Sequence, residues 1–250
     1  QLLHADTALI ACLFAAFEIA LFLLVPNFLH RVLVSAGAAG ALVVAMAVWG
    51  LFPYTQAVIF AAFSWAWLNE FRFPTRSAEL RALGYGLALL LFTGLVTERS
   101  SQLLTSAWSG HGGLPLIGGP YAVWIGAGLS GAIMLWVVWR LLVRQGIAIT
   151  QGPGLAALAG AALVALITVK APGFGITVSV LLLGFANGNR VLAGVGILAL
   201  LAYWSYYYYS LEISLLQKSA LLLCAGVVLI AARLAMKRTW PTNPNEARNA

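Results

Sequence analysis

One carboxyl group stands alone in a long apolar run near the start of the chain. Glu18 lies in FAAFEIALF, and no other charged side chain occurs between Asp6 and Arg31. A carboxyl among apolar residues is costly, so such a residue is a functional candidate by default. Two interpretations remain open. Glu18 binds a proton or cation or pairs with a basic residue, or it is a protonated or hydrogen-bonded carboxyl between helices.

Two further ionisable candidates lie in YWSYYYYSLEISLLQKS, residues 203–219. Glu212 and Lys218 are six positions apart, which does not place them on one helical face. Lys218 either extends its stem past the tyrosines towards water or has a functional role beside Glu212.

The tyrosines of the same stretch form an uninterrupted run. Consecutive residues of a helix point about 100° apart, so the rings wrap the helix instead of lining one side. This arrangement favours an aromatic belt at a membrane surface over a lip that binds a partner or ligand. The run consists of Tyr206, Tyr207, Tyr208 and Tyr209.

The sequence ANGNR, residues 186–190, predicts a turn between two helices. Gly188 can adopt a positive φ there at little cost, and Arg190 would begin the next helix. We interpret Asn189 and Arg190 as contacts to a partner or a lipid phosphate, with a plain topological anchor as the alternative for Arg190.

Motifs of enzymatic chemistry are absent from the sequence. It contains no GxSxG, HExxH, Walker A or CxxCH pattern, and Cys12 and Cys224 lie singly within apolar runs. The connection at residues 97–119 holds Glu98, Arg99 and His111, which would form a site only by folding over a cleft. We therefore expect no catalytic residue, no cofactor and no metal site.

The amino-acid composition indicates whether these residues lie in a soluble protein or in a membrane protein. Hydrophobic residues make up 62% of the chain and charged residues 8%, whereas soluble domains are about 45–50% apolar and roughly 25% charged. The long, non-alternating apolar runs predict membrane-spanning helices rather than barrel strands. The net charge of +7 comes from scattered basic residues, so we expect the lipid bilayer, and not nucleic acid, as a partner.

The sequence predicts an all-α, polytopic membrane helical bundle of about nine transmembrane segments. The third and seventh segments are shorter than the roughly 20 residues of a spanning helix. KAPGFG (residues 170–175) before the seventh segment is either a tight turn or part of a broken helix at a transport site. The segments run at about Thr7–Val25, Phe28–Leu51, Tyr54–Leu68, Leu80–Val96, Tyr121–Leu142, Gly154–Val169, Gly175–Ala186, Val191–Tyr208 and Ile213–Met236.

The distribution of basic residues predicts the orientation of these segments. Nine spans with the N-terminus outside and the C-terminus cytoplasmic leave only Arg99, Lys170 and Lys218 on the outer side. We expect one transmembrane domain over residues 1–238, at least one helix upstream of Gln1, and a polar cytoplasmic tail at 239–250. The other eleven basic residues then lie inside, as positive-inside topology requires: Arg31, Arg72, Arg76, Arg81, Arg140, Arg144, Arg190, Arg233, Lys237, Arg238 and Arg248.

Aromatic and small residues agree with this arrangement. All nine tryptophans fall near predicted segment ends, where amphipathic rings occupy the membrane interface. Trp65 and Trp67 are examples. Small residues recur at i, i+4 spacing in residues 35–41, 126–132 and 154–162, which predicts close helix packing.

The stretches GFANGNRVLAGVGILALL and YYYYSLEISLLQKSALLL resemble the bacterial membrane family catalogued as domain of unknown function 4401. The resemblance covers roughly residues 180–235. It implies a polytopic protein of the bacterial cytoplasmic (inner) membrane, often encoded beside a membrane protein named for a GDYXXLXY motif. It implies no activity. The residues that carry it are Gly188, Asn189, Arg190, Tyr206, Tyr207, Tyr208, Leu215, Leu216, Lys218 and Ser219.

Three functions remain open from the sequence. The first is a non-catalytic subunit or partner-binding component of a membrane assembly. The second is a small-solute or proton-coupled ion transporter that uses Glu18. The third is an enzyme that acts on a lipid-linked substrate at the outer face.

Overall fold

The computed structural model describes residues 2–108, 121–171 and 173–210, together with Ser219, Leu223, Gly226, Val227 and Ile230. Within these residues all regular structure is helical. The elements are α1 (Leu2–Leu24), α2 (Phe28–Val48), α3 (Phe52–Asn69), the 3-10 helix η1 (Pro74–Arg76), α4 (Ser77–Trp108), α5 (Ala122–Arg144), α6 (Gly152–Lys170), α7 (Phe174–Ala186) and α8 (Arg190–Ser210).

The eight α-helices correspond to the first eight predicted segments. Helix α3 is longer than expected, with 18 residues. Helix α4 runs without a break through the first half of the connection at 97–119, so this part is not a separate element. The ninth predicted segment lies almost entirely outside the described residues.

Five of the described helices are long and apolar enough to cross a membrane, which is the character of a membrane protein. Helix α7, with 13 residues, is apolar but too short to be counted among them. The five candidate spans are Asp6–Leu24, Phe28–Val48, Ala122–Arg144, Gly152–Val169 and Arg190–Tyr209.

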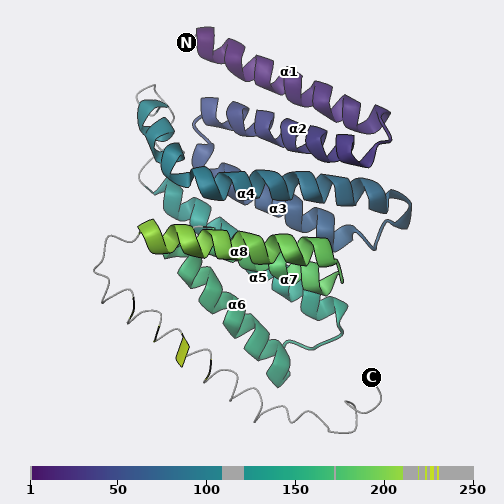
Figure 1. Cartoon of the computed structure of the whole chain (residues 1–250), viewed down its shortest axis with the longest axis vertical. Coiled ribbons are helices and arrows are strands. Elements are labelled where there is room, and N and C mark those ends of the chain that lie inside the picture. Colours follow the sequence, from purple (N-terminus) through teal and green to yellow (C-terminus); the bar gives the residue numbers. More distant parts are fainter. Residues whose placement is uncertain are drawn as a thin grey trace. The chain divides into compact units, whose positions relative to one another are not determined.

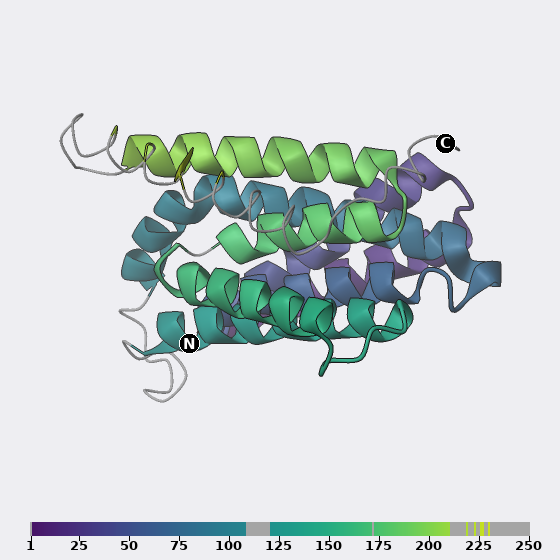
Figure 2. The ribbon, with the colours of Figure 1, turned by 90° about the horizontal axis from the view of Figure 1, so that it is seen from below.

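The helices up to Tyr203 pack in an order that differs from their order in sequence (Figure 1). Helix α1 packs on α2, α2 on α4, α4 on α3, α3 on α5, and α5 on α6. Helix α7 packs against α5, α6 and α3, and Figure 2 shows it running between α6 and α8. Helix α1 is therefore peripheral: 17% of its apolar stretch is buried, against 44% for α5.

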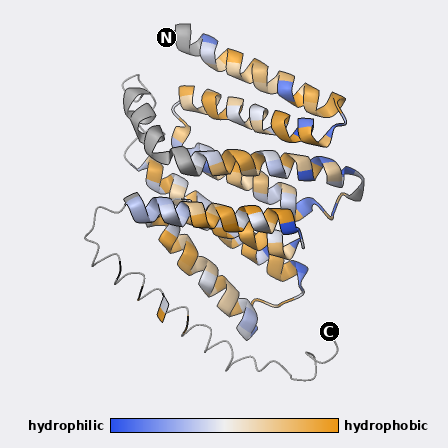
Figure 3. Cartoon of the chain, viewed as in Figure 1, coloured by the Kyte–Doolittle hydropathy of each residue, from blue (hydrophilic) through white to orange (hydrophobic). Residues whose placement is uncertain are grey.

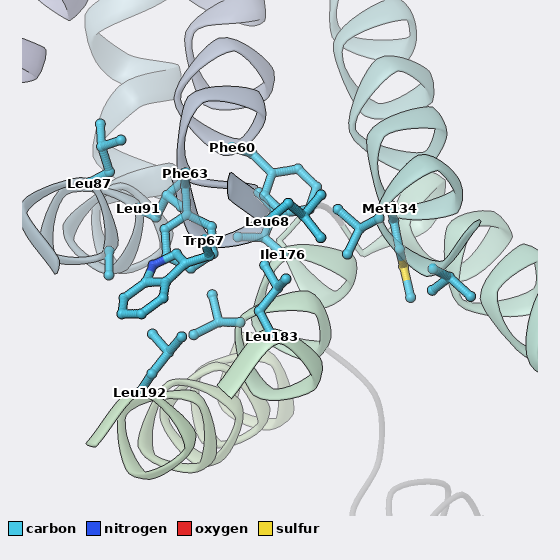
Figure 4. Packing of buried hydrophobic residues seen from close by; sticks show 14 of the residues in the cluster. Phe60, Phe63, Trp67, Leu68, Leu87, Leu91, Met134, Ile176, Leu183 and Leu192 are labelled. Carbon is cyan, nitrogen blue, oxygen red and sulfur yellow. The ribbon is translucent and has the colours of Figure 1, made fainter. Parts of the chain in front are cut away.

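The core lies where α3, α4, α5, α7 and α8 meet, and its largest side chain is Trp67 (Figure 4). Trp67 is completely buried, although the sequence predicted an interfacial ring. Its indole fits over Gly84 of α4, where an added Cβ would lie 2.5 Å from the indole nitrogen. Because Gly84 has no side chain, α4 leaves room for the Trp67 ring to pack inward, whereas Trp65 is 49% exposed.

Small residues permit close contact between helices, as the sequence predicted for its three stretches. Gly37 faces Glu18 of α1, and Gly126 lies against the carbonyl of Pro53 on α3. Gly131 packs on Ala165 of α6. In the third stretch, Ala161 is 4% exposed and belongs to the core, whereas Gly160 faces outward with no atom within 4 Å of an added Cβ.

Both predicted breaks around α7 are tight turns. Gly173 precedes α7 with φ +96°, and Gly188 follows it with φ +63°, as the sequence predicted for Gly188. Beyond the second turn, α8 returns along α7. An added Cβ at Gly184 would lie 2.5 Å from the backbone nitrogen of Ala193. The two backbones thus touch.

The chain divides into two compact parts, Gln1–Tyr203 and Trp204–Ala250. The division falls within α8. The single domain predicted over residues 1–238 stays a prediction.

Candidate functional site

Hydrogen bonds and ion pairs bring the ends of several helices together in the first part of the chain. The last turn of α5 lies there together with three connections between helices: α1–α2, α3–α4 and α7–α8. We call this region the arginine end, because it carries seven basic residues: Arg31, Arg72, Arg76, Arg81, Arg140, Arg144 and Arg190. Figure 3 shows hydrophilic residues at the ends of α2, α4 and α8 that lie there. All seven were predicted to share one side of the membrane.

The α7–α8 turn is fixed to α3 by Asn187. Its amide nitrogen donates to the carbonyl oxygen of Trp67 at 2.9 Å and to Oε2 of Glu70 at 3.4 Å. Its amide oxygen accepts a hydrogen bond from Nη1 of Arg144 at 3.3 Å. One side chain thereby joins the ends of three helices.

Glu70 is the buried charge of this network. It is 3% exposed, and its Oε1 accepts from Nε of Arg81, whose side chain is half exposed. A carboxylate at this depth is stable only if it is paired and hydrogen-bonded. Arg81 supplies the pairing and Asn187 the second hydrogen bond. Glu70 therefore cross-links α3, α4 and the α7–α8 turn.

Asn189 caps α8 and binds α4. Its side-chain oxygen accepts from the backbone nitrogens of Val191 and Leu192, both at 3.1 Å, as an N-cap residue does. Its amide nitrogen donates to the hydroxyl of Tyr85 at 2.8 Å. The Tyr85 ring packs edge-on against Trp67, with ring centroids 5.2 Å apart. The GNR turn of the family resemblance is thus a structural joint.

A second ion pair holds the α1–α2 connection at the same end. Nη1 of Arg31 lies 3.4 Å from Oε1 of Glu79 on α4. Nε of Arg31 donates to the carbonyls of Phe22 and Val25 at 3.0 and 3.1 Å. Arg31 therefore ties the end of α1 to the start of α4.

A pocket of about 260 Å³ opens beside this network, between the ends of α3 and α5. Three of its six lining residues are arginines. The guanidinium of Arg144 also lies over the ring of Phe71, 5.4 Å from its centroid. The lining residues are Leu68, Asn69, Phe71, Arg72, Arg140 and Arg144.

Glu18 lies in the second half of α1, one turn before Phe22, whose carbonyl binds Arg31. It is half-buried against α2, where an added Cβ at Gly37 would lie 3.4 Å from its carboxyl carbon. Among the described residues, no hydrogen bond or ion pair reaches it. Its carboxyl group therefore lies at a helix seam without a partner among the described residues.

The tyrosine run lies at the end of α8, in the second part of the chain. The rings of Tyr208 and Tyr209 form an edge-to-face pair with centroids 5.6 Å apart. Tyr206 and Tyr208 are half-buried, and Tyr207 and Tyr209 are exposed, the latter by 82%. The membrane belt that the sequence favours for these tyrosines stays a prediction. Glu212 and Lys218 lie outside the described residues.

Sequence reasoning missed Glu70, Asn187 and Tyr85. Glu70 lies in NEFRF and carries a usable signal, since a carboxylate beside basic residues in a short connection invites an ion pair. Asn187 and Tyr85 carry none, because their partners are 117 and 104 positions away. Within the part of the chain described here, no group of three or more His, Cys, Asp or Glu residues could hold a metal ion.

The eight described helices and the polar joints between them define a helical protein of membrane character. Residues 2–239 match the family described as Domain of unknown function (DUF4401). The chain belongs to this family, and the match extends well beyond the residues 180–235 that carried the resemblance. Neither a curated protein nor a solved structure shows significant similarity to the chain.

Proposed function

We propose that the chain is a non-catalytic subunit of a bacterial inner-membrane assembly, and that the α1–α2 seam at Glu18 contacts another membrane protein. The observation that supports this most is the half-buried Glu18 carboxylate, which no described residue pairs. A carboxylate within an apolar span is costly without a partner. A second protein can supply that partner.

The partner we propose is a transmembrane helix that presents a hydrogen-bond donor, such as a basic or amide side chain. Helix α1 is peripheral and mostly exposed, so such a helix can approach it. Phe14, four residues before Glu18 and 50% exposed, would lie at the edge of the contact. The GDYXXLXY-type neighbour that the resemblance implies is the first candidate.

The polar joints at the arginine end support a structural role for the remaining buried charge. Glu70, Asn187 and Asn189 bind other helices of the same chain, so their hydrogen-bonding capacity is used within the fold. This leaves Glu18 as the described intramembrane candidate for an outside contact.

Two substitutions of Glu18 test this proposal in native membranes. Glu18→Leu removes the acceptor, and we expect recovery of the co-purifying membrane protein in mild detergent to fall by about threefold to thirtyfold, since one interhelical hydrogen bond contributes roughly 0.6–2 kcal/mol. Glu18→Gln keeps an acceptor oxygen and should retain most of the partner.

The same variants separate the subunit from a proton-coupled transporter. A transporter would show proton flux in liposomes with the purified chain alone, and Glu18→Gln would abolish that flux. We expect no such flux. Flux that depends on Glu18, with no co-purifying partner, would replace the proposal by the transporter.

The topology proposed with this function has nine spans, an outer N-terminus and a cytoplasmic C-terminus, so that the arginine end faces the cytoplasm. Tyr121 and Gln145 flank α5 at its two ends, and both are exposed. In a chain whose Cys12 and Cys224 are replaced, Tyr121→Cys should react with a membrane-impermeant thiol reagent on intact cells and Gln145→Cys should not. The reverse pattern would invert the topology.

A further inference from the structure

The pocket between the ends of α3 and α5 concentrates positive charge that no described carboxylate neutralises. Arg72, Arg140 and Arg144 line it, and within the described residues no carboxylate forms an ion pair with any of them. Glu70 is adjacent in sequence to this lining, but it is buried and bonded to Arg81 and Asn187. The Glu70 carboxylate is therefore already bonded within the fold.

The helix ends at the pocket reduce this charge only in part. Helices α3 and α5 both point their C-termini here, and each terminus is equivalent to roughly −0.5 elementary charge. Three arginines then leave an excess of about +2. An anion bound in the pocket would remove the mutual repulsion of the guanidinium groups.

The lining combines guanidinium groups with apolar side chains. Arg144 is held in place by Asn187 and by the ring of Phe71, so it loses little side-chain freedom when it binds. Guanidinium groups bind phosphate oxygens in pairs of parallel hydrogen bonds. Leu68 and Phe71 give the pocket an apolar wall. A volume of about 260 Å³ lies just below the range of about 300–1,000 Å³ for pockets that enclose a drug-sized ligand.

We propose that the pocket lined by Arg72, Arg140 and Arg144 binds the phosphate group of a phosphate ester. The ester is either an anionic lipid headgroup or a soluble metabolite, and both present the same group to the arginines. This site is separate from the Glu18 seam, so it stands whether or not the subunit proposal does.

The test uses the purified full chain in nanodiscs or detergent, with two probes. Native mass spectrometry follows binding of short-chain phosphatidylglycerol, with diacylglycerol as the uncharged comparison. Calorimetry follows binding of glycerol 3-phosphate in nanodiscs of zwitterionic lipid. Each is repeated with Arg72→Gln/Arg140→Gln and with the matched control Arg76→Gln, an exposed arginine at the same end outside the pocket.

We expect one probe to bind the original chain and the Arg76→Gln chain alike, and the double variant to bind it at least about tenfold more weakly. If the double variant binds phosphatidylglycerol more weakly, the pocket is a site for a lipid headgroup. If it binds glycerol 3-phosphate more weakly, the ligand is soluble. The Arg72→Lys/Arg140→Lys chain keeps the charge without the paired hydrogen bonds and should fall between. Equal binding by all chains, or no binding of either probe, would overturn the proposal.

Discussion

Two carboxyl groups among the described residues, Glu70 and Glu18, differ in whether the fold supplies their bonding partners. Glu70 is 3% exposed and is bonded to Arg81 and Asn187, which come from two other parts of the fold. Glu18 is half-buried against Gly37, and no described residue bonds to it. The difference shows that burial alone does not mark a functional charge. A carboxylate whose partners are built into the fold stabilises it, whereas one without them remains available to something else.

Glu70→Ala tests whether the Glu70 carboxylate stabilises the fold, and we expect it to have the largest effect on the free energy of unfolding. The change leaves the half-exposed Arg81 guanidinium without its acceptor and removes one of the two hydrogen bonds that the Asn187 amide nitrogen donates. We expect a loss of about 3 kcal/mol, because each hydrogen bond to a charged group contributes roughly 1.5–3 kcal/mol. Unfolding in mixed micelles, followed as denaturing detergent is added, should show this loss. The control Glu79→Gln affects a pair whose carboxylate is 36% exposed and should lower the free energy of unfolding by less than about 1 kcal/mol. Equal effects would refute the assignment of Glu70 as a cross-link.

Asn187→Ala tests the joint from its other side. It removes the hydrogen bonds to the Trp67 carbonyl, Glu70 and Arg144, and we expect a loss of about 2–3 kcal/mol, since a buried carbonyl is left unpaired. The same micelle titration measures it. An unaltered midpoint would mean that the α7–α8 turn is held by its apolar contacts alone.

Tyr85→Phe tests the contact between the Tyr85 hydroxyl and the Asn189 side chain, in which the hydroxyl lies within hydrogen-bond distance of both the amide nitrogen and the amide oxygen. It keeps the ring that packs on Trp67 but removes the hydroxyl that binds Asn189. The free energy of unfolding should fall by about 1 kcal/mol. A loss as large as that for Asn187→Ala would show that the hydroxyl contributes more than its contacts with the Asn189 amide nitrogen and oxygen.

Glu18→Gln should have the smallest effect on the isolated chain. No described group bonds to this carboxylate, so its neutral isostere should change the free energy of unfolding by no more than about 0.5 kcal/mol. Purified chains in one detergent provide the measurement. A destabilisation comparable to that of Glu70→Ala would reveal an internal partner and remove the ground for an outside one.

The helices were predictable because each depends on a local pattern. Apolar runs, Gly and Pro breaks and the arginines at the segment ends give eight helices, with boundaries near those expected except for α4, which continues to Trp108 instead of ending near Val96. The grouping of seven arginines at one end follows from the same alternation of spans. Gly188 adopts the positive φ that its place in ANGNR indicates.

The site could not be predicted because it depends on which helices are neighbours. Helix α4 lies between α2 and α3, an order that no local pattern specifies. Trp67 is buried because Gly84 of α4 faces it, and Tyr85, one residue later, bonds to Asn189 across 104 positions. The arginine-lined pocket likewise requires Arg72 of the α3–α4 connection and Arg140 of α5 to be brought together.

Photo-crosslinking from α1 in native membranes tests most directly whether another membrane protein contacts the α1–α2 seam at Glu18. A photoreactive residue at position 14 replaces Phe14 beside Glu18, and a matched one replaces Leu163, which is 59% exposed on peripheral helix α6. We predict one discrete adduct with a membrane protein from position 14 and none from position 163. No adduct from position 14, or the same adducts from both positions, would contradict a partner at the Glu18 seam.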